Sequence, residues 1–247
     1  MQKERIIELP KITDERGTLS FAEIEQHIPF RISQVSWITT DKQIRKQGEE
    51  IFIALTGSFN IVIDGNKKYV LDRPQKALFV PDKLDRTIKS ISDNAIFLVI
   101  SSESEKDKSS SSLLKEYFIA DCPVIRLSES GKKYITNEDI PFDIKRIFYI
   151  SGIPAGEQRG MHAHKFCHEI LIAINGKFNV ELDDGTNRKT VILDNPAYGL
   201  HIPPGIWAVE REYSQDVVCL VLASDKYDAD NYINTYSDFI KYRQDGN

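Results

Sequence analysis

Short runs of Val, Ile, Leu and Phe, broken by polar turn residues, follow one another along most of the chain. The runs either alternate apolar and polar residues or stay apolar for a few positions, which is typical of β-strands. They are bounded by Asn-Gly, Asp-Gly, Asn-Pro and Pro-Pro-Gly sequences, which favour turns. Within 169–185, two runs flank Asn175-Gly176, a pair suited to the type I′ turn of a hairpin. The pattern predicts an all-β fold of the sandwich or jelly-roll kind.

This pattern occurs twice with its segments in the same order, which indicates an internal repeat. The offset between matching positions is 112 residues for the first pair of segments, 119 for the second and 122 for the last two. The pairs are "HIPFRISQVSWI" (27–38) with "DIPFDIKRIFYI" (139–150), "EIFIALTGSFNIVIDG" (50–65) with "EILIAINGKFNVELDDG" (169–185), "VLDRPQKALFVP" (70–81) with "ILDNPAYGLHIP" (192–203), and "AIFLVISS" (95–102) with "VVCLVLAS" (217–224). We therefore expect two tandem jelly-roll domains, over residues 1–115 and 116–247.

Helical signals occur only at the ends of these domains. The segment 101–118 is polar and Ser-rich and then turns amphipathic, which predicts a linker leading into a short helix. The C-terminal segment 225–243 begins with several Asp residues and carries spaced aromatic residues, which predicts a second short helix.

Composition narrows the class of protein. The formal charge of -5 and the pI near 5.6 argue against a nucleic acid or an anionic membrane as the main partner. The N-terminus lacks the apolar core of a signal peptide, and no apolar run reaches the length of a membrane span. Three cysteines without a CxxC pair favour free thiols in a reducing, cytoplasmic setting.

The two halves differ most in one connection. The offset grows from 112 to 119 there, so the second half carries seven extra residues, and "SGIPAGEQRGMHAHK" (151–165) lies at this place. The first half has "TTDKQIRKQGE" (39–49), without histidine. His162 and His164 are two positions apart, so on a strand both rings point to the same face. Two imidazoles crowded on a core face are costly unless function or hydrogen bonding compensates. We therefore expect a functional site in the second half.

The other histidines carry weaker signals. His168 lies beyond an expected kink at 165–167, so the direction of its ring is open. His201 and His27 are more simply interpreted as structural residues. Cys167, next to His168, is more simply a small buried residue than a nucleophile.

The spacing around the histidine pair resembles the first motif of the cupin superfamily, G-x5-H-x-H-x3–4-E-x6-G. The matching residues are Gly156, His162, His164, Glu169 and Gly176. In metal-binding cupins a further histidine follows a Pro-x-Gly turn, but here Ala208 stands at that place after 203–205. Three ligands still suffice for an open catalytic metal site. The residues alone therefore leave two chemistries open, a metal centre and acid–base catalysis by histidine.

A closer resemblance extends over both halves. "RGMHAHK" (159–165), "VELDDG" (180–185), "LDNPAYGLHIPPGIW" (193–207) and "DVVCLVLASDKYDADNYINTYSDFIK" (216–241) resemble the sugar 3,4-ketoisomerases of the WxcM-like family. "DERGTLSFAEIEQHIPF" (14–30) resembles the start of the single domain of that family. The resemblance implies a jelly-roll enzyme without metal or other cofactor. It implies a nucleotide-linked substrate, typically a dTDP-hexose with a 4-keto-6-deoxy sugar, whose carbonyl moves from C4 to C3.

The same resemblance implies site residues and an assembly. His164 would be the principal base and His162 its partner. Family members commonly form dimers with exchanged strands, so this chain would form a homodimer or would imitate that dimer internally, with the first half supplying strands. Glu169 and His201 depart from the family, because glutamine and an aromatic residue are common at these two positions.

The chemistry of the residues is compatible with this. Moving a ketone to the neighbouring carbon requires removal of an α-proton, an enediol and return of a proton, and imidazole titrates in the range this needs, near pH 6.5. We expect substrate contacts from Arg159, Arg146 and Tyr149, with Glu169 and His168 beside them. A surface cation or a packed aromatic is the plain alternative for Arg159, Arg146 and Tyr149. A metal-dependent cupin enzyme and a non-catalytic sugar-binding module are the competing functions.

Overall fold

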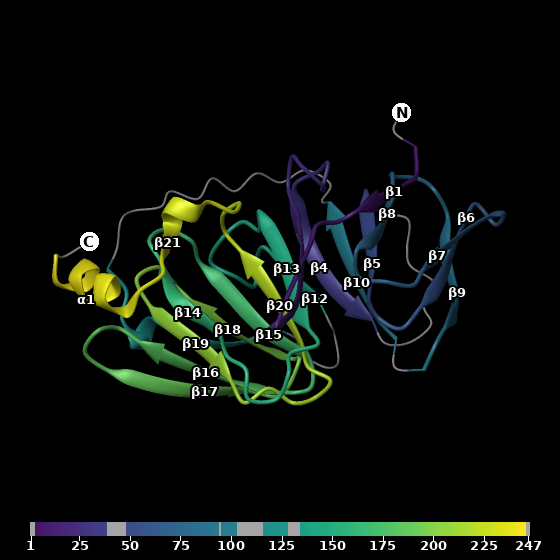
Figure 1. Ribbon diagram of the computed structural model, residues 1–247. Coiled ribbons are helices and arrows are strands. Elements are labelled where there is room, and N and C mark those ends of the chain that lie inside the picture. Colours follow the sequence, from purple (N-terminus) through teal and green to yellow (C-terminus); the bar gives the residue numbers. More distant parts are fainter. Residues whose placement is uncertain (1–2, 39–47, 94, 103–115, 128–133, 246–247) are drawn as a thin grey trace. The chain divides into compact units, whose positions relative to one another are not determined.

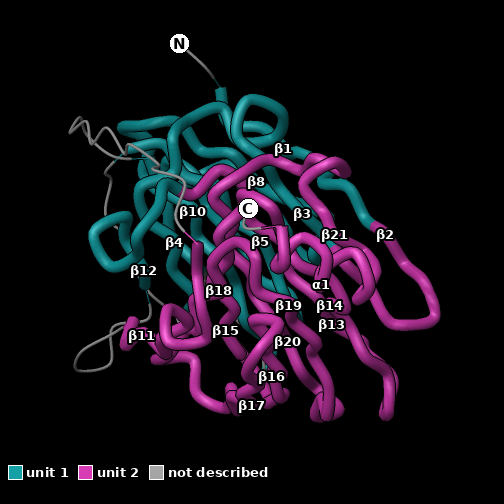
Figure 2. Tube along the Cα trace, turned by 90° about the vertical axis from the view of Figure 1, so that its left-hand side faces the viewer, with its two compact units in different colours: residues 1–11, 20–109, 133–143 teal, residues 12–19, 110–132, 144–247 magenta. Residues whose placement is uncertain are grey.

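The computed structural model describes residues 3–38, 48–93, 95–102, 116–127 and 134–245 (Figure 1). These residues form two compact units, residues 1–11, 20–109 and 133–143 in unit 1 and residues 12–19, 110–132 and 144–247 in unit 2 (Figure 2). Regular structure in the described part is almost entirely β-strand, so the predicted all-β class is confirmed. None of the described helices is long and apolar enough to span a membrane.

Unit 1 consists of two antiparallel sheets. One has the strand order β1-β8-β5-β10-β4-β12 and the other β7-β6-β9. Its core is formed by large apolar side chains of both sheets, among them Phe52, Phe59 and Phe97. The strands are β1 (Arg5–Glu8), β4 (Ile32–Ile38), β5 (Glu50–Thr56), β6 (Phe59–Ile63), β7 (Lys67–Leu71), β8 (Lys76–Val80), β9 (Arg86–Ile91), β10 (Ile96–Ser102) and β12 (Tyr134–Thr136).

Unit 2 has the same plan with additional strands. Its sheets have the orders β11-β18-β15-β20-β13-β3-β2 and β17-β16-β19-β14-β21. Between them lies a core that includes Phe178, Leu182 and Val221. The strands are β2 (Lys11–Asp14), β3 (Gly17–Glu23), β11 (Val124–Arg126), β13 (Arg146–Ser151), β14 (Arg159–His164), β15 (Glu169–Asn175), β16 (Phe178–Asp183), β17 (Arg188–Leu193), β18 (Tyr198–Ile202), β19 (Trp207–Arg211), β20 (Val218–Ala223) and β21 (Tyr232–Ile233).

The strand orders confirm the predicted duplication. The order β8-β5-β10-β4 of unit 1 matches β18-β15-β20-β13 of unit 2, and β7-β6-β9 matches β17-β16-β19. The repeated sequence segments contain all or nearly all of β4, β5, β6, β8 and β10 of unit 1 and their counterparts β13, β15, β16, β18 and β20 of unit 2, so both units are jelly rolls of the expected tandem cupin type. Unit 2 places β14, the strand with the histidine pair, beside β19. The corresponding segment 39–49 of the first half lies mostly outside the described residues.

Each unit also takes in a segment from the other half of the sequence. β12 pairs with β4 at the edge of a unit 1 sheet, with Tyr134 opposite Ser36. Residues 12–19, which include most of β2 and the start of β3, belong to unit 2 (Figure 2). There they extend the sheet beyond β13. Unit 2 is therefore built from both halves of the sequence.

Two local predictions need correction. The Asn175-Gly176 segment is not a hairpin turn, because β15 and β16 lie in different sheets of unit 2. Only Gly176 has positive φ, +69°, and its added Cβ would lie 2.3 Å from Ser214 Oγ. Glycine thus permits a tight corner between facing sheets rather than a type I′ turn, which needs two residues with positive φ.

The helix predictions are met in part. The C-terminal helix α1 spans Tyr236–Gln244 and begins after the N-cap Thr235, whose hydroxyl accepts a hydrogen bond from Asp238 N. The Asp-rich segment before it forms a 3₁₀ turn, η2 (Ala229–Asn231), and then β21 rather than helix. Most of the expected linker, 103–115, lies outside the described residues, and the 3₁₀ turn η1 (Ile119–Asp121) follows it.

Candidate active site

A β-bulge in β14 directs the histidine pair into the interior of unit 2. Gly160 pairs with Val209 and His162 with Ala208, so Met161 is an extra residue without a partner across the strand. Gly160 and Met161 both have positive φ, +72° and +57°. A Cβ on Gly160 would lie 2.7 Å from the Ala208 carbonyl oxygen, so only glycine fits this approach. Bulges of this kind re-aim side chains and are enriched next to active sites.

The bulge changes which residues of β14 share a face. In a regular strand Arg159 would point away from His162 and His164, because it is an odd number of positions from each. With one extra residue between them, Arg159 lies opposite Glu210 and His162 opposite Ala208. Ala163 points to the other face, where it packs against Trp207. Arg159 and both histidines therefore face the interior together.

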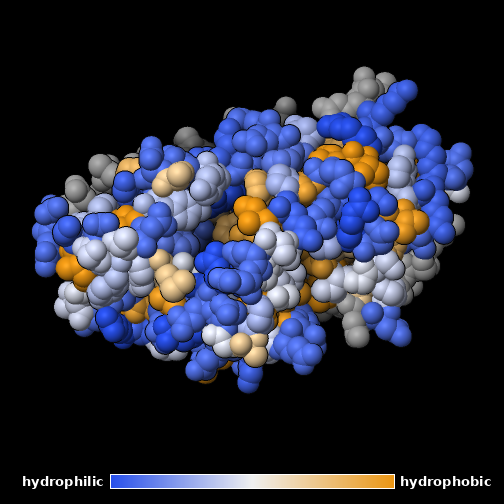
Figure 3. Space-filling model, viewed as in Figure 1, coloured by the Kyte–Doolittle hydropathy of each residue, from blue (hydrophilic) through white to orange (hydrophobic). Residues whose placement is uncertain are grey.

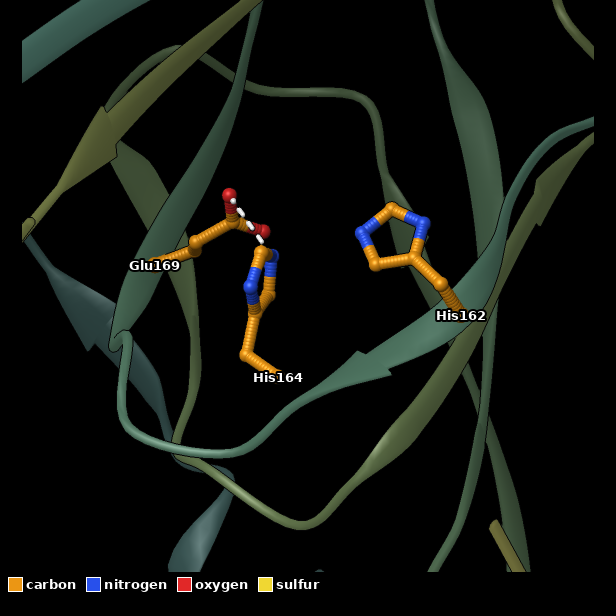
Figure 4. Close-up of side chains that lie close together, drawn as sticks. All are labelled: His162, His164 and Glu169. Atoms are coloured by element: carbon orange, nitrogen blue, oxygen red, sulfur yellow. Dashed lines mark ion pairs between the residues drawn. The ribbon is translucent and has the colours of Figure 1, made fainter. Parts of the chain in front are cut away.

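His164 lies in a buried polar cluster with Glu169 and Arg146. His164 Nε2 lies 3.3 Å from Glu169 Oε1, the ion pair marked in Figure 4. Arg146 Nη2 lies 3.7 Å from the same oxygen. Burial raises the pKa of Glu169, but the interaction with His164, and then with His162 and Arg146, outweighs it and lowers the pKa to about 2. Glu169 is thus a fixed anion that orients the His164 ring.

His162, also on β14, lies next to His164 and to Tyr232 of β21. Its ring centroid lies 4.9 Å from that of His164 and 5.0 Å from that of Tyr232. The ring centroid of Tyr232 lies 4.4 Å from that of His164. Arg146 Nη1 donates a hydrogen bond of 3.4 Å to the Tyr232 hydroxyl oxygen. Burial and the neighbouring His164 lower the pKa of His162, which favours its neutral form. The surface of unit 2 is hollowed on the side that carries β21 (Figure 3).

Tyr232 was missed by sequence reasoning. It lies in the C-terminal segment for which we predicted a helix, whereas β21 pairs with β14 and sets Tyr232 opposite His164. This pairing joins positions far apart in the chain, so no local pattern indicates it. The spacing of the aromatic residues was the one sequence signal that included Tyr232, and it suggested a helix.

Tyr149 and His168 are not brought to this cluster. Tyr149 is three positions from Arg146 on β13, and an odd separation on a strand places two side chains on opposite faces. The ring of His168 stacks on that of His201, with 3.0 Å between His168 Nδ1 and His201 Nε2. His201 pairs with Ile170, the neighbour of Glu169, and so lies on the other face of the sheet. The structure thus separates both residues from the histidine pair.

Glu210 is a second buried carboxyl in the same interior. Tyr213 donates a hydrogen bond of 2.5 Å from its hydroxyl to Glu210 Oε2. Burial raises the pKa of Glu210 to about 7, against the opposing effect of this hydrogen bond. The raised pKa means that ionising Glu210 destabilises the folded state.

Replacement of Glu210 by glutamine is therefore expected to stabilise unit 2 at high pH. The unfolded carboxyl ionises near pH 4.5 and the folded one near 7, so wild-type stability falls as pH rises through this window. Relative to wild type, E210Q should gain about 2–3 kcal/mol at pH 8 and little at pH 4. Thermal unfolding at several pH values measures this, with the exposed Glu138→Gln as control. An equal effect of E210Q at both pH values would contradict the assignment.

His162, His164 and Glu169 also have the geometry of a metal site. One ligand atom from each lies within 4.8 Å of the other two. Two imidazoles and one carboxylate form a donor set that suits Zn²⁺ or Fe²⁺ with open positions. The Arg146 guanidinium next to Glu169 acts against this, because its positive charge already neutralises the carboxylate that a cation would need.

The matching place in unit 1 is filled by an arginine. Glu50 corresponds to Glu169 in the repeat, and Arg86 corresponds to Ala208. Arg86 Nε lies 2.5 Å from Glu50 Oε2, and both side chains are buried. The Arg86 guanidinium also donates to the carbonyl oxygens of Pro81, Leu84 and Gly48. Where unit 2 has Ala208 opposite His162, unit 1 has a buried ion pair of its own.

Comparison with known proteins places the chain in one family. The family model described as "WxcM-like, C-terminal" (FdtA) matches residues 2–112 and again 128–244. The chain belongs to the WxcM-like family. It is 45% identical over 106 residues to the TDP-4-oxo-6-deoxy-alpha-D-glucose-3,4-oxoisomerase of Aneurinibacillus thermoaerophilus. This match covers 43% of this chain and 76% of that protein. The expected resemblance is thereby confirmed.

Solved structures of single-copy relatives match about half of this WxcM-like chain. The sugar 3,4-ketoisomerase QdtA from Thermoanaerobacterium thermosaccharolyticum, in complex with TDP, is 32% identical with a TM-score of 0.49. That match covers 52% of this chain and 98% of QdtA. The TDP-quinovose 3,4-ketoisomerase WlaRB from Campylobacter jejuni is 34% identical with a TM-score of 0.46, covering 49% and 98% of the two chains.

Proposed function

We propose that this protein is a nucleotide-sugar 3,4-ketoisomerase that acts on a dTDP-4-keto-6-deoxyhexose through unit 2. The observation that carries the proposal is the interior cluster of His162, His164 and Glu169 in a chain of the WxcM-like family. The relative that is 45% identical is named for this reaction.

His164 acts as the base in this proposal. Neither ring nitrogen has a hydrogen-bond partner among the described residues, but Nε2 lies 3.3 Å from Glu169 Oε1. In this proposal Nε2 stays with the carboxylate, and Nδ1 takes the proton from C3 of the sugar. The electron pair of the broken C–H bond forms the C3–C4 double bond of an enediolate with its charge on the C4 oxygen, and His162 relays the proton of the C3 hydroxyl to that oxygen. The His164 imidazolium then returns its proton to C4, and the C3 oxygen becomes the ketone oxygen.

The other groups stabilise the charge that develops. His162, kept neutral by burial, donates to or accepts from the oxygens of the enediol. Arg146 on β13 and Arg159 on β14 point into the interior from different sheets and offer guanidinium groups to the enediolate or to the diphosphate. The reaction needs no oxidant, because one carbon is oxidised as its neighbour is reduced.

A metal-dependent isomerase or oxygenase is the second candidate. The mutual proximity of the three ligand atoms favours it. In that case His162, His164 and Glu169 would hold the metal, which would supply Lewis acidity for polarising the ketone.

An NMR time course in D2O distinguishes these functions. Chelator-treated protein is incubated with dTDP-4-keto-6-deoxyglucose, and the metal content is measured before and after treatment. We expect a 3-keto product with deuterium or a transferred proton at C4, whose coupling constants give the configuration there. Activity that returns only with added metal would favour the second candidate. Binding of dTDP without turnover under either condition would refute both and leave a sugar-binding module.

A further inference from the structure

We propose that Asp14 is a positioning residue for the isomerase site, and that the turn 14–17 from the first half of the sequence holds Arg159 in place. The proposal rests on the function proposed above. It assigns a role to a segment that carries none of the site's histidines and that belongs to unit 2.

The turn contacts Arg159 at two atoms. Arg159 Nε donates a hydrogen bond of 3.1 Å to the Arg16 carbonyl oxygen, and Arg159 Nη2 lies 3.6 Å from Asp14 Oδ1. The arginine is 8% exposed, so these contacts are made by a largely buried guanidinium. They orient its planar group from one side.

The turn 14–17, which we call the clamp, is itself held by hydrogen bonds between its own residues. The backbone N–H and the guanidinium of Arg16 both donate to the Asp14 carboxylate, at 2.9 Å to Oδ1 and at 2.7 and 3.2 Å to Oδ2. Gly17, with φ +113°, approaches β13 so closely that a Cβ would lie 3.0 Å from the Ser151 carbonyl oxygen. The turn is therefore seated on unit 2 by a contact that only glycine permits.

Arg159 needs such a partner because of its surroundings. The bulge turns it inward, opposite Glu210. Glu210 is hydrogen-bonded by Tyr213 and its ionisation is disfavoured by burial. Asp14 supplies a carboxylate that balances the guanidinium and holds it on the face of β14 that also carries the histidine pair.

The two halves of the sequence have changed in complementary ways. The first half keeps "DERG" (14–17), whereas the second half has "SESG" (128–131) at the matching place, without the aspartate and the arginine. The histidine pair shows the reverse, because only the second half has it. Both retained parts belong to unit 2. Each half has thus kept the residues that serve one shared site.

Kinetics of D14N, R159K and the double variant test the clamp. We expect D14N to lower kcat about 10- to 100-fold, because loss of orientation at a reacting centre has effects of this size. The exposed Asp72→Asn serves as a matched control and should be unchanged. The loss in D14N should not add to that in R159K, because both act through one guanidinium. Full additivity, or a D14N enzyme like D72N, would overturn the proposal.

Failure of the clamp can be told apart from failure of the isomerase function. Wild-type turnover is measured first, so active wild type with unaffected D14N refutes only the clamp. If the wild type is inactive, hydrogen exchange at Arg159 Nε–H, identified by loss of its NMR signal in R159K, decides. Faster exchange in D14N than in D72N supports the clamp, and equal exchange refutes it.

Discussion

Replacement of His164 by asparagine is expected to lower turnover of dTDP-4-keto-6-deoxyglucose by about 10²–10⁴-fold, the usual contribution of a positioned acid–base group. Asparagine is close in size and keeps a polar group near Glu169, whose carboxylate lies 3.3 Å from His164 Nε2. It cannot take a proton near neutral pH, so binding should persist while chemistry is lost. Initial rates by NMR and dTDP affinity by calorimetry measure the two effects.

The assignment of His164 rather than His162 as the base is tested alongside. H162N removes the partner ring but leaves the His164–Glu169 pair, so we expect a smaller loss. H27N makes the same change at a histidine of unit 1 and should have normal activity. A larger loss in H162N than in H164N would reverse the two roles.

Replacement of Arg86 by methionine is expected to destabilise unit 1 by about 3–5 kcal/mol, the cost of leaving one member of a buried ion pair uncompensated. Arg86 and Glu50 are almost completely buried, and Arg86 also satisfies three backbone carbonyl groups. Burial raises the pKa of Glu50 to about 7 although Arg86 opposes this, and loss of Arg86 raises it further. The destabilisation should therefore grow as the pH rises, and we expect the full loss only at alkaline pH.

The two tryptophans make this measurement specific. Trp37 lies in unit 1 and Trp207 in unit 2, so a W207F background reports unit 1 through Trp37 fluorescence during urea unfolding. The double variant E50M/R86M should recover most of the loss, because apolar replacement of a whole buried pair is often neutral. If the double variant is as unstable as R86M, packing and backbone contacts of Arg86 rather than charge hold unit 1 together.

Local pattern predicted much of the fold. The alternation of apolar residues and the position of turn sequences gave the strands, and the ordered repeats predicted two jelly rolls whose strand orders match. The i, i+2 spacing of His162 and His164 placed both rings on one face, as the structure has them. These inferences succeed because side-chain direction along a strand depends only on neighbouring residues.

Errors arose where local patterns break or carry no direction. Tyr149 was expected at the site together with Arg146, although regular alternation along β13 puts side chains three positions apart on opposite faces. The expected hairpin at Asn175-Gly176 is a corner between sheets, because a turn sequence does not say which strands will pair. Arg159 reaches the site only because Met161 is an extra residue in β14.

The sequence by itself determined the strand composition, the duplication and the residue types of the site. Tertiary structure decided which of them meet: Tyr232 beside His164 through the β14–β21 pairing, and Asp14 beside Arg159 through the exchange of residues 12–19 into unit 2. These contacts join positions 68 and 145 residues apart. Their formation depends on loop closure and on pairing with distant strands, which the periodicity of a short segment does not encode.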